Sequence, residues 1–299
     1  MPKQQITKRC HWLSQSYLSA FAADAAGEKI WRYSKNEGEP ELKPIENVAV
    51  RFYLYAPRKA DGRRDDAVER KLGQLEQWFG HPLWKVLCDG ETDLTWEPVR
   101  KMLALIVATT YARNPVQFES WKRLHRRFVD DLRGHERLPI HVTIGSARHE
   151  VDPSDWPAFR DAGDEEMKAA WNDYVAGAGD IAPKLLSMRM VMLASDKPVF
   201  ITSDNPVTIT HPSLEFRGIN DPETVISFPI SPTRMLILDN QHGEPDGVYY
   251  ELPDDNAAAQ NLLVWRHAME HMFCHRDPHE VCAELVADED RLLSASKGR

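Results

Sequence analysis

The chain has 299 residues, of which 42% are hydrophobic and 28% are charged, a composition typical of a globular protein and not of a disordered one. It carries 46 acidic and 37 basic residues, a formal net charge of −9. This balance disfavours non-specific coating of nucleic acid or anionic membrane, because the average field repels phosphate.

The first half of the chain is predicted to be mainly helical. The spacing of apolar residues predicts helices over 11–21, 67–79, 97–112 and 116–132, and β-branched and aromatic residues predict strands over 30–33 and 48–55. Within the helix over 97–112, the part from Met102 to Thr110 is apolar nearly all round, which favours a central buried position. Thr95 can cap it, and Asn114-Pro115 ends it because the residue before proline disfavours helix.

The second half is predicted to supply most of the sheet. Helices are expected over 165–175 and 181–194, and a last one over 255–275 with Asp254 or Asp255 as its cap. The segment 152–163 reads as a loop, and strands are expected over 140–144, 198–202, 207–210, 225–230, 235–238 and 248–251. We therefore expect an α+β fold, a helical layer packed on a mainly antiparallel sheet contributed largely by the C-terminal half. We expect one domain over 1–299, with a variable insert at about 140–194.

The cellular compartment is predicted from absences. The first residues lack the apolar run of a signal peptide, and the longest apolar stretch, Met102 to Thr110, is too short to cross a bilayer. The four cysteines, Cys10, Cys88, Cys274 and Cys282, do not have the spacing of a disulfide framework. We expect a cytoplasmic protein without a membrane partner.

Several motifs follow one another along nearly the whole chain, from His11 to about His275. They are HWLSQSYLSAF, IWRY, NVAVRFYLY, Arg113-Asn114-Pro115, VFITSDNPV, FPISPTRMLIL and Asn261. Together they resemble the bacterial family catalogued as domain of unknown function 4238, and HWLSQSYL and FITSDNPV are the most specific of them. The resemblance implies a fold and a set of suspect residues but no particular reaction.

The turn Ser203-Asp204-Asn205-Pro206 follows a predicted buried strand. Asp and Asn side chains often bond to nearby backbone and proline stiffens the exit, so a structural turn is one interpretation. The other is that Asp204 and Asn205 face a cleft, where carboxylate and amide oxygens bind a metal, orient water or hold a polar ligand. Ser203 and Asn261, which lie in motifs of the resemblance, are further substrate-binding candidates.

The N-terminal motif contributes His11, Gln15 and Tyr17. His11 and Gln15 are four residues apart and share a face if the segment is helical. His11 could act as general base or metal ligand, with Gln15 and Tyr17 as hydrogen-bonding groups. In the alternative interpretation the segment only caps and packs, with Tyr17 buried.

Arg113 leaves an apolar helix just before a proline, where an unpaired guanidinium is costly to bury. One interpretation is a structural ion pair, with Glu76 or Asp204 as the partner. The other is a fork that holds a carboxylate or phosphate of a substrate.

Four histidines recur at intervals of four, namely His267, His271, His275 and His279. On a single helix His271 and His275 could chelate a metal. No HExxH motif is present and Asp277-Pro278 breaks the helix, so a solvated helix face is the favoured interpretation.

The motifs leave two main hypotheses about function. The sequence lacks the glycine-rich signatures of P-loop, dinucleotide-binding and α/β-hydrolase proteins. The first hypothesis is a hydrolytic or phosphodiester-cleaving enzyme with His11, Asp204 and Asn205 as catalytic groups, Arg113 as anion clamp and a divalent metal as a conceivable cofactor. The second is a non-catalytic protein that binds or senses a small molecule, as an accessory to stress or phage defence. A nucleic-acid partner for the basic helix around Arg126 is a third hypothesis.

Overall fold

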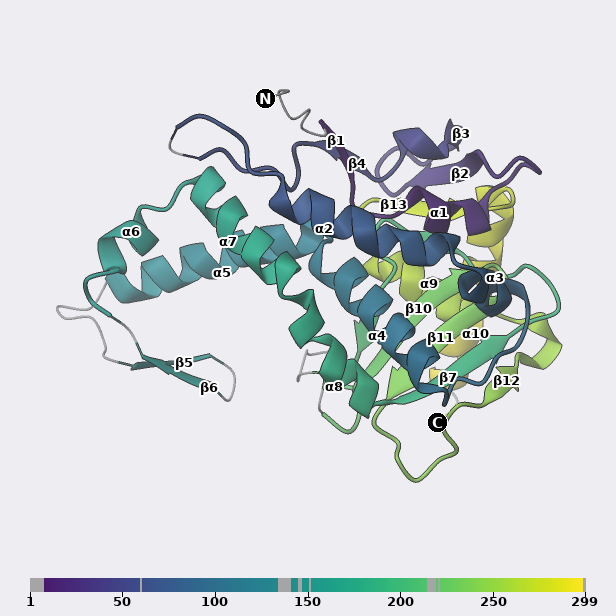
Figure 1. Cartoon of the computed structure of the whole chain (residues 1–299). Coiled ribbons are helices and arrows are strands. Elements are labelled where there is room, and N and C mark those ends of the chain that lie inside the picture. The colour runs from purple at the N-terminus through teal and green to yellow at the C-terminus, as the bar shows by residue number, and fades with distance from the viewer. Residues whose placement is uncertain are drawn as a thin grey trace.

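The computed structural model in Figure 1 describes residues 8–59, 61–133, 141–144, 147–150, 152–213, 219 and 221–297. For residues 142–144, 147–149, 289 and 291–297 only the backbone is described. The first seven residues, used above to predict the compartment, and Ile140, the predicted start of a strand, lie outside the described residues.

The described residues form an α+β fold, as predicted. The α-helices are α1 (Gln15–Leu18), α2 (Ala67–Glu76), α3 (Pro82–Asp89), α4 (Glu97–Ala112), α5 (Pro115–Arg133), α6 (Trp156–Arg160), α7 (Asp164–Ala176), α8 (Ala182–Ser187), α9 (Ala258–His267) and α10 (Pro278–Lys297). The strands are β1 (Arg9–His11), β2 (Lys29–Ser34), β3 (Pro40–Pro44), β4 (Val50–Phe52), β5 (His141–Ile144), β6 (Ala147–Glu150), β7 (Arg189–Ala194), β8 (Thr202–Ser203), β9 (Thr208–Thr210), β10 (Val225–Ser231), β11 (Arg234–Asp239), β12 (Tyr249–Glu251) and β13 (His271–Cys274). None of the helices in the described part of the chain is long and apolar enough to span a membrane.

Two sheets organise the molecule. The larger has the strand order β12-β7-β11-β10-β9 and is antiparallel except for the β12–β7 pair. It comes from the C-terminal half, as expected, and includes β7 from the segment predicted to be a variable insert. The second sheet has the order β3-β2-β13-β8 and combines strands from both ends of the chain.

Both faces of the larger sheet are covered by other elements. Successive residues of a strand point to opposite sides, and those of β11 belong to two different hydrophobic clusters. Leu236 and Leu238 of β11 belong to the main hydrophobic cluster, which also contains Leu103 and Val107 of α4. Met235 of β11 belongs to a second cluster with residues of α9, α10 and β13. Figure 1 shows α4 crossing one face of this sheet, while α5, α6, α7 and the hairpin β5–β6 project to one side.

The long apolar helix is where the sequence predicted it. α4 spans Glu97–Ala112, with Pro98 in its first turn and buried residues on all sides. The expected cap is wrong, because Trp96 precedes the helix and the Thr95 hydroxyl donates to Asp93 instead. α5 starts at Pro115, where the Asn114 side chain accepts the Val116 N–H.

Several boundaries were predicted wrongly. The helix expected over 181–194 ends with α8, and its second half is β7. The helix expected over 255–275 is α9 followed by β13, and the expected loop over 152–163 contains α6. The strands expected over 48–55 and 198–202 shrink to β4 and β8. The four histidines therefore do not share a helix: His267 ends α9, His271 begins β13, His275 follows that strand and His279 lies in α10.

Candidate functional site

The family-like motifs meet at one buried point, the Asp204 junction, formed by Trp12, Arg113, Asn114 and Asp204. Trp12 Nε1 and Asn114 Nδ2 each donate a 2.9 Å hydrogen bond to the Asp204 carbonyl oxygen. Arg113 Nε donates to the Trp12 carbonyl at 2.6 Å. The junction joins the N-terminal segment, the link between α4 and α5 and the turn after β8, and its largest sequence separation is 192 residues.

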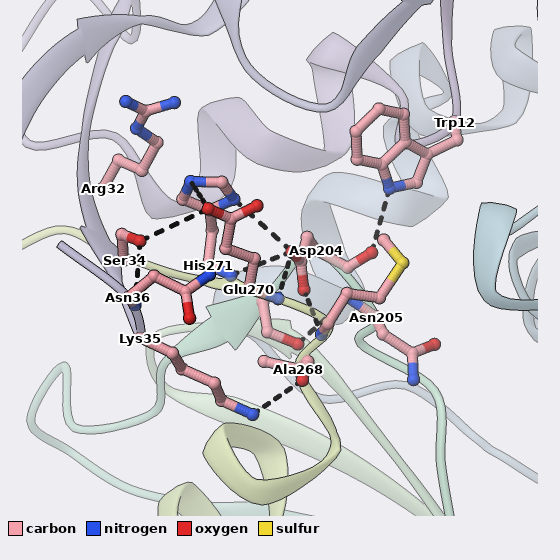
Figure 2. Close-up of polar contacts among 12 residues, drawn as sticks. Trp12, Arg32, Ser34, Lys35, Asn36, Asp204, Asn205, Ala268, Glu270 and His271 are labelled. Carbon is pink, nitrogen blue, oxygen red and sulfur yellow. Dashed lines mark hydrogen bonds and ion pairs between the residues drawn. The ribbon is translucent and has the colours of Figure 1, made fainter.

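The Asp204 carboxylate is fully engaged inside the protein (Figure 2). Its Oδ1 accepts the Met269 N–H at 2.7 Å, and its Oδ2 accepts the N–H groups of Glu270 and His271 at 2.9 and 2.8 Å. The residue is 2% exposed. These bonds connect the turn after β8 to the backbone between α9 and β13, so the carboxylate fixes the start of β13.

Arg113 forms the structural ion pair with Glu76 that the sequence suggested. The Nη1–Oε1 distance is 3.0 Å, and the Arg113 side chain is 4% exposed. The cavity lined by both residues offers about 10 Å³, the room of about one water molecule. This geometry favours the structural interpretation over an anion clamp.

Tyr17 is buried with its hydroxyl satisfied. The hydroxyl donates to the Pro229 carbonyl at 2.8 Å, so Thr202 Oγ1, at 2.7 Å, must be its donor. Its ring stacks on Phe228 with centroids 5.2 Å apart, and burial raises the pKa of the phenol. Tyr17 thereby links α1 to both sheets.

His11, Ser203 and Asn205 are also bonded to other groups of the protein. His11 Nε2 donates to the Glu46 carbonyl at 3.0 Å, and burial lowers the pKa of the imidazole. Ser203 Oγ accepts the Asn205 N–H, and Asn205 Nδ2 donates to the His267 carbonyl.

Asn261 holds the segment that leads into β8. Its Oδ1 accepts the Ile201 N–H at 3.0 Å, and its Nδ2 donates to the Val199 carbonyl at 2.8 Å. Gln15 differs from the other candidates, because it is exposed and lines an open cavity of about 570 Å³ together with Ser16 and Lys29.

One titratable group lies beside the Asp204 carboxylate (Figure 2). His271 Nδ1 is 3.5 Å from Asp204 Oδ2, and its Nε2 is 3.9 Å from Glu270 Oε1. Ser34 Oγ donates to the same Glu270 oxygen at 3.4 Å. A carboxylate that orients an imidazole is an arrangement used for proton transfer, so His271 and not Asp204 is the group here that could act on a substrate.

A larger cavity, of about 730 Å³, opens between the start of α9, the end of β13 and α10. We call it the α9–α10 cavity, and its lining residues are Lys197, Pro198, Val199, Asp254, Asp255, Asn256, Ala257, Ala258, His275, Arg276, Glu284, Ala287 and Asp288. Burial lowers the pKa of His275 to about 4, which keeps its ring neutral. The Arg276 guanidinium makes two 2.6 Å bonds to the Glu284 carboxylate.

The rim of the α9–α10 cavity contains two residues in a left-handed conformation. Asp254 has φ 54° and Asp255 has φ 51°. Asp reaches this region more readily than most residues other than glycine, because its short polar side chain can bond to nearby backbone. The Ser195 hydroxyl and Lys197 Nζ hold the Asp255 carboxylate at 2.8 and 3.0 Å.

The comparison with known families agrees with the motifs. The sequence profile of the family described as protein of unknown function, DUF4238, matches residues 9–278. The chain belongs to this family. The match confirms the resemblance and extends from β1 to the start of α10, so the Asp204 junction lies wholly within the DUF4238 region. No curated protein and no solved structure shows significant similarity to the chain.

Sequence reasoning missed the α9–α10 cavity and the neighbour of Asp204. The only local signal for the cavity was Leu252-Pro253 followed by two Asp and an Asn, residues that tolerate left-handed backbone. The proximity of His271 to Asp204 had no local signal, because the two residues are far apart in sequence and β13 was predicted as helix.

Proposed function

We propose that this DUF4238 protein is a binding protein for a small organic cation, which it holds in the α9–α10 cavity. The observation that carries the proposal is the cavity itself. Its volume of about 730 Å³ lies within the range of sites for small molecules, about 300–1,000 Å³. Nearly all polar groups of the motif residues, by contrast, are hydrogen-bonded within the protein.

The charges around the cavity favour a cationic ligand. The carboxylates of Asp254, Asp255 and Glu284 line it, against the two cations Lys197 and Arg276. Both cations are already paired, Lys197 with Asp255 and Arg276 with Glu284. The exposed Asp254 carboxylate favours a bound cation, whereas an anion would meet an excess of negative charge.

The rest of the lining favours an apolar body on that ligand. Pro198, Val199, Ala257 and Ala287 contribute hydrocarbon, and the neutral ring of His275 adds an uncharged surface. An amine or guanidine attached to a short carbon chain or ring combines both properties. We therefore propose agmatine-like and phenethylamine-like molecules as the ligand class.

The test is a thermal-shift and calorimetry panel on the full chain. Agmatine, spermidine and phenethylamine are compared with glutarate and phenylpropionate, the matched anions. We expect at least one amine to bind and to stabilise the fold by about 1.4 kcal/mol at ten times its Kd, while neither anion binds. The proposal is contradicted if only the anions bind. It is also contradicted if no amine binds at concentrations up to 10 times a Kd of about 1 mM.

A pair of variants on α10 localises the binding. Ala287 is exposed and lines the cavity, whereas Ala283, one turn earlier, is also exposed but does not line it. Ala287→Trp should fill the cavity and abolish amine binding, and Ala283→Trp should leave it unchanged. Equal effects of the two substitutions, or none, place the ligand elsewhere. We further propose a cytoplasmic location, which is supported by four cysteines that form no disulfide bond with one another.

A second candidate function is hydrolysis at His271. It is favoured by the Asp204 carboxylate 3.5 Å from Nδ1, which could hold the ring as a general base. The assay is hydrolysis of p-nitrophenyl acetate and of bis-p-nitrophenyl phosphate, with and without divalent metal. His271→Gln should remove the activity and His242→Gln, at an exposed loop position, should not; turnover that survives His271→Gln refutes this role.

A further inference from the structure

The loop between β9 and β10 brings three metal-ligating side chains together. His211 follows β9 directly, and Asp221 and Glu223 precede β10. His211 Nε2 lies 3.1 Å from Asp221 Oδ1 and 3.7 Å from Glu223 Oε2. All three donor atoms lie within 4.8 Å of one another.

These distances match the spacing between ligands on one metal ion. Nitrogen and oxygen ligands bind Zn²⁺ at about 2.0–2.2 Å, so neighbouring ligand atoms on such an ion are about 3–3.5 Å apart. The two separations from Nε2 are close to this range without any rearrangement of the backbone. A single ion placed among the three atoms would contact one imidazole and two carboxylates.

The histidine is held in the orientation that such a site requires. The His211 side chain is only 8% exposed, so its ring is fixed by packing. Its second nitrogen, Nδ1, lies 2.7 Å from Ser213 Oγ. The Ser213 N–H also donates to Nδ1, at 3.1 Å, so the ring proton lies on Nε2 and faces Asp221 Oδ1, 3.1 Å away, when no metal is bound. A metal ion would replace that proton on Nε2, and the Nδ1–H of the bound ring would then donate to Ser213 Oγ, the kind of bond that usually orients a metal-binding histidine.

The two acidic ligands are placed by bonds within the protein. Asn240 Nδ2 donates to the carbonyls of Ile219 and Asp221 at 2.9 and 2.7 Å, and the Thr224 N–H donates to the Asp221 carbonyl at 3.0 Å. Asp221 Oδ1 also accepts the Glu223 N–H at 3.0 Å. The carboxylates therefore emerge from a bonded turn that leads into β10 of the five-stranded sheet.

We propose that His211, Asp221 and Glu223 form a binding site for one divalent transition-metal ion, with Zn²⁺ as the best-fitting ion. One imidazole and two carboxylates suit Zn²⁺, and less closely Mn²⁺ or Co²⁺. Mg²⁺ and Ca²⁺ fit worse, because their sites use oxygen ligands alone. Three protein ligands leave a coordination position for water, the arrangement of open zinc sites. This site is separate from the α9–α10 cavity and does not depend on the proposed ligand.

The test is metal titration of the untagged full chain after treatment with EDTA. Isothermal calorimetry should show one Zn²⁺ per chain, and Co²⁺ should give a visible spectrum without a thiolate-to-cobalt charge-transfer band. Such a band would assign the ion to cysteines and overturn the proposal. A chain that binds neither ion more tightly than about 100 μM overturns it as well.

Matched variants locate the ion. His211→Ala should weaken Zn²⁺ binding at least 100-fold, and His242→Ala, which removes an exposed histidine from another loop, should leave it unchanged. Glu223→Gln keeps the size of an exposed side chain and should weaken binding about 10-fold or more without altering the thermal midpoint of the metal-free protein. Ser213→Ala should weaken it about 10-fold, the lower end for a group that orients a ligand. If both His211→Ala and Glu223→Gln bind Zn²⁺ like the original chain, the site lies elsewhere.

Discussion

Removal of the Asp204 carboxylate should lower the free energy of unfolding of the chain even when no ligand is present. Asp204→Ala leaves three backbone N–H groups, those of residues 269–271, without their acceptor. A buried N–H without a partner costs about 1–3 kcal/mol. Because these groups are part-buried and water can reach them in some degree, we use about 1 kcal/mol each, a loss of about 3 kcal/mol. This is a large part of the 5–15 kcal/mol that stabilises a typical domain.

The assay is urea unfolding followed by far-UV circular dichroism. Asp204→Asn keeps an oxygen for the two N–H groups that bond to Oδ2 and should lose less, about 1–2 kcal/mol. Asp173→Ala, at an exposed position of α7, serves as the control and should change the free energy of unfolding by less than 0.5 kcal/mol. A loss below about 1 kcal/mol for Asp204→Ala would refute the structural role that we assign to the junction.

Three further predictions concern stability. Tyr17→Phe leaves the Pro229 carbonyl and the Thr202 hydroxyl without their buried partner and should lower the free energy of unfolding by about 1–2 kcal/mol; an unchanged urea midpoint contradicts this. Glu76→Gln leaves the buried Arg113 guanidinium without its counter-charge and should lower it by about 3 kcal/mol, more than Arg113→Met, because the Glu76 carboxylate that Arg113→Met leaves behind is partly exposed; the reverse order counts against a buried ion pair. His275 has a folded pKa of about 4 against 6.5 in the unfolded chain, so the unfolded state takes up the proton first. Stability should fall as the pH drops from 6.5 towards 4, by up to about 1.4 kcal/mol per pH unit, and His275→Gln should remove this part of the slope; an identical slope in the variant refutes the assignment.

The helices with the strongest internal pattern could be predicted from the sequence. α4 was placed with its correct limits because its apolar residues continue round the whole helix and Asn114-Pro115 stops it. α5 and α7 followed from amphipathic spacing and from glycine or proline at their ends. In these elements the local preference and the final packing agree, so no distant contact is needed to explain them.

The helix predicted over 255–275 failed because its end is set by a distant residue. No glycine or proline interrupts the sequence between His267 and Cys274, so nothing local marks a boundary. The Asp204 carboxylate captures the N–H groups of residues 269–271, and β2 and β8 then pair with the strand that follows. The second half of the helix expected over 181–194 became β7 for a similar reason, because β11 and β12 pair with it on either side.

The motifs indicated which residues matter but not what they do. The residue types at Asp204, Asn205 and Arg113 are those of active sites, and the structure brings the motifs that contain them together. Whether such a group is offered to a ligand or bonded within the protein depends on backbone atoms that lie far away in sequence. The sequence did not predict the α9–α10 cavity, because its walls come from three segments that are separate along the chain.

Hydrogen–deuterium exchange with and without agmatine tests the central claim most directly, because it reports on the cavity and the Asp204 junction in one experiment on the intact chain. The account predicts slower exchange on binding in 253–258, 275–276 and 284–288, and no change in 201–206 or 113–116. Protection at the Asp204 junction with none around the α9–α10 cavity would contradict it.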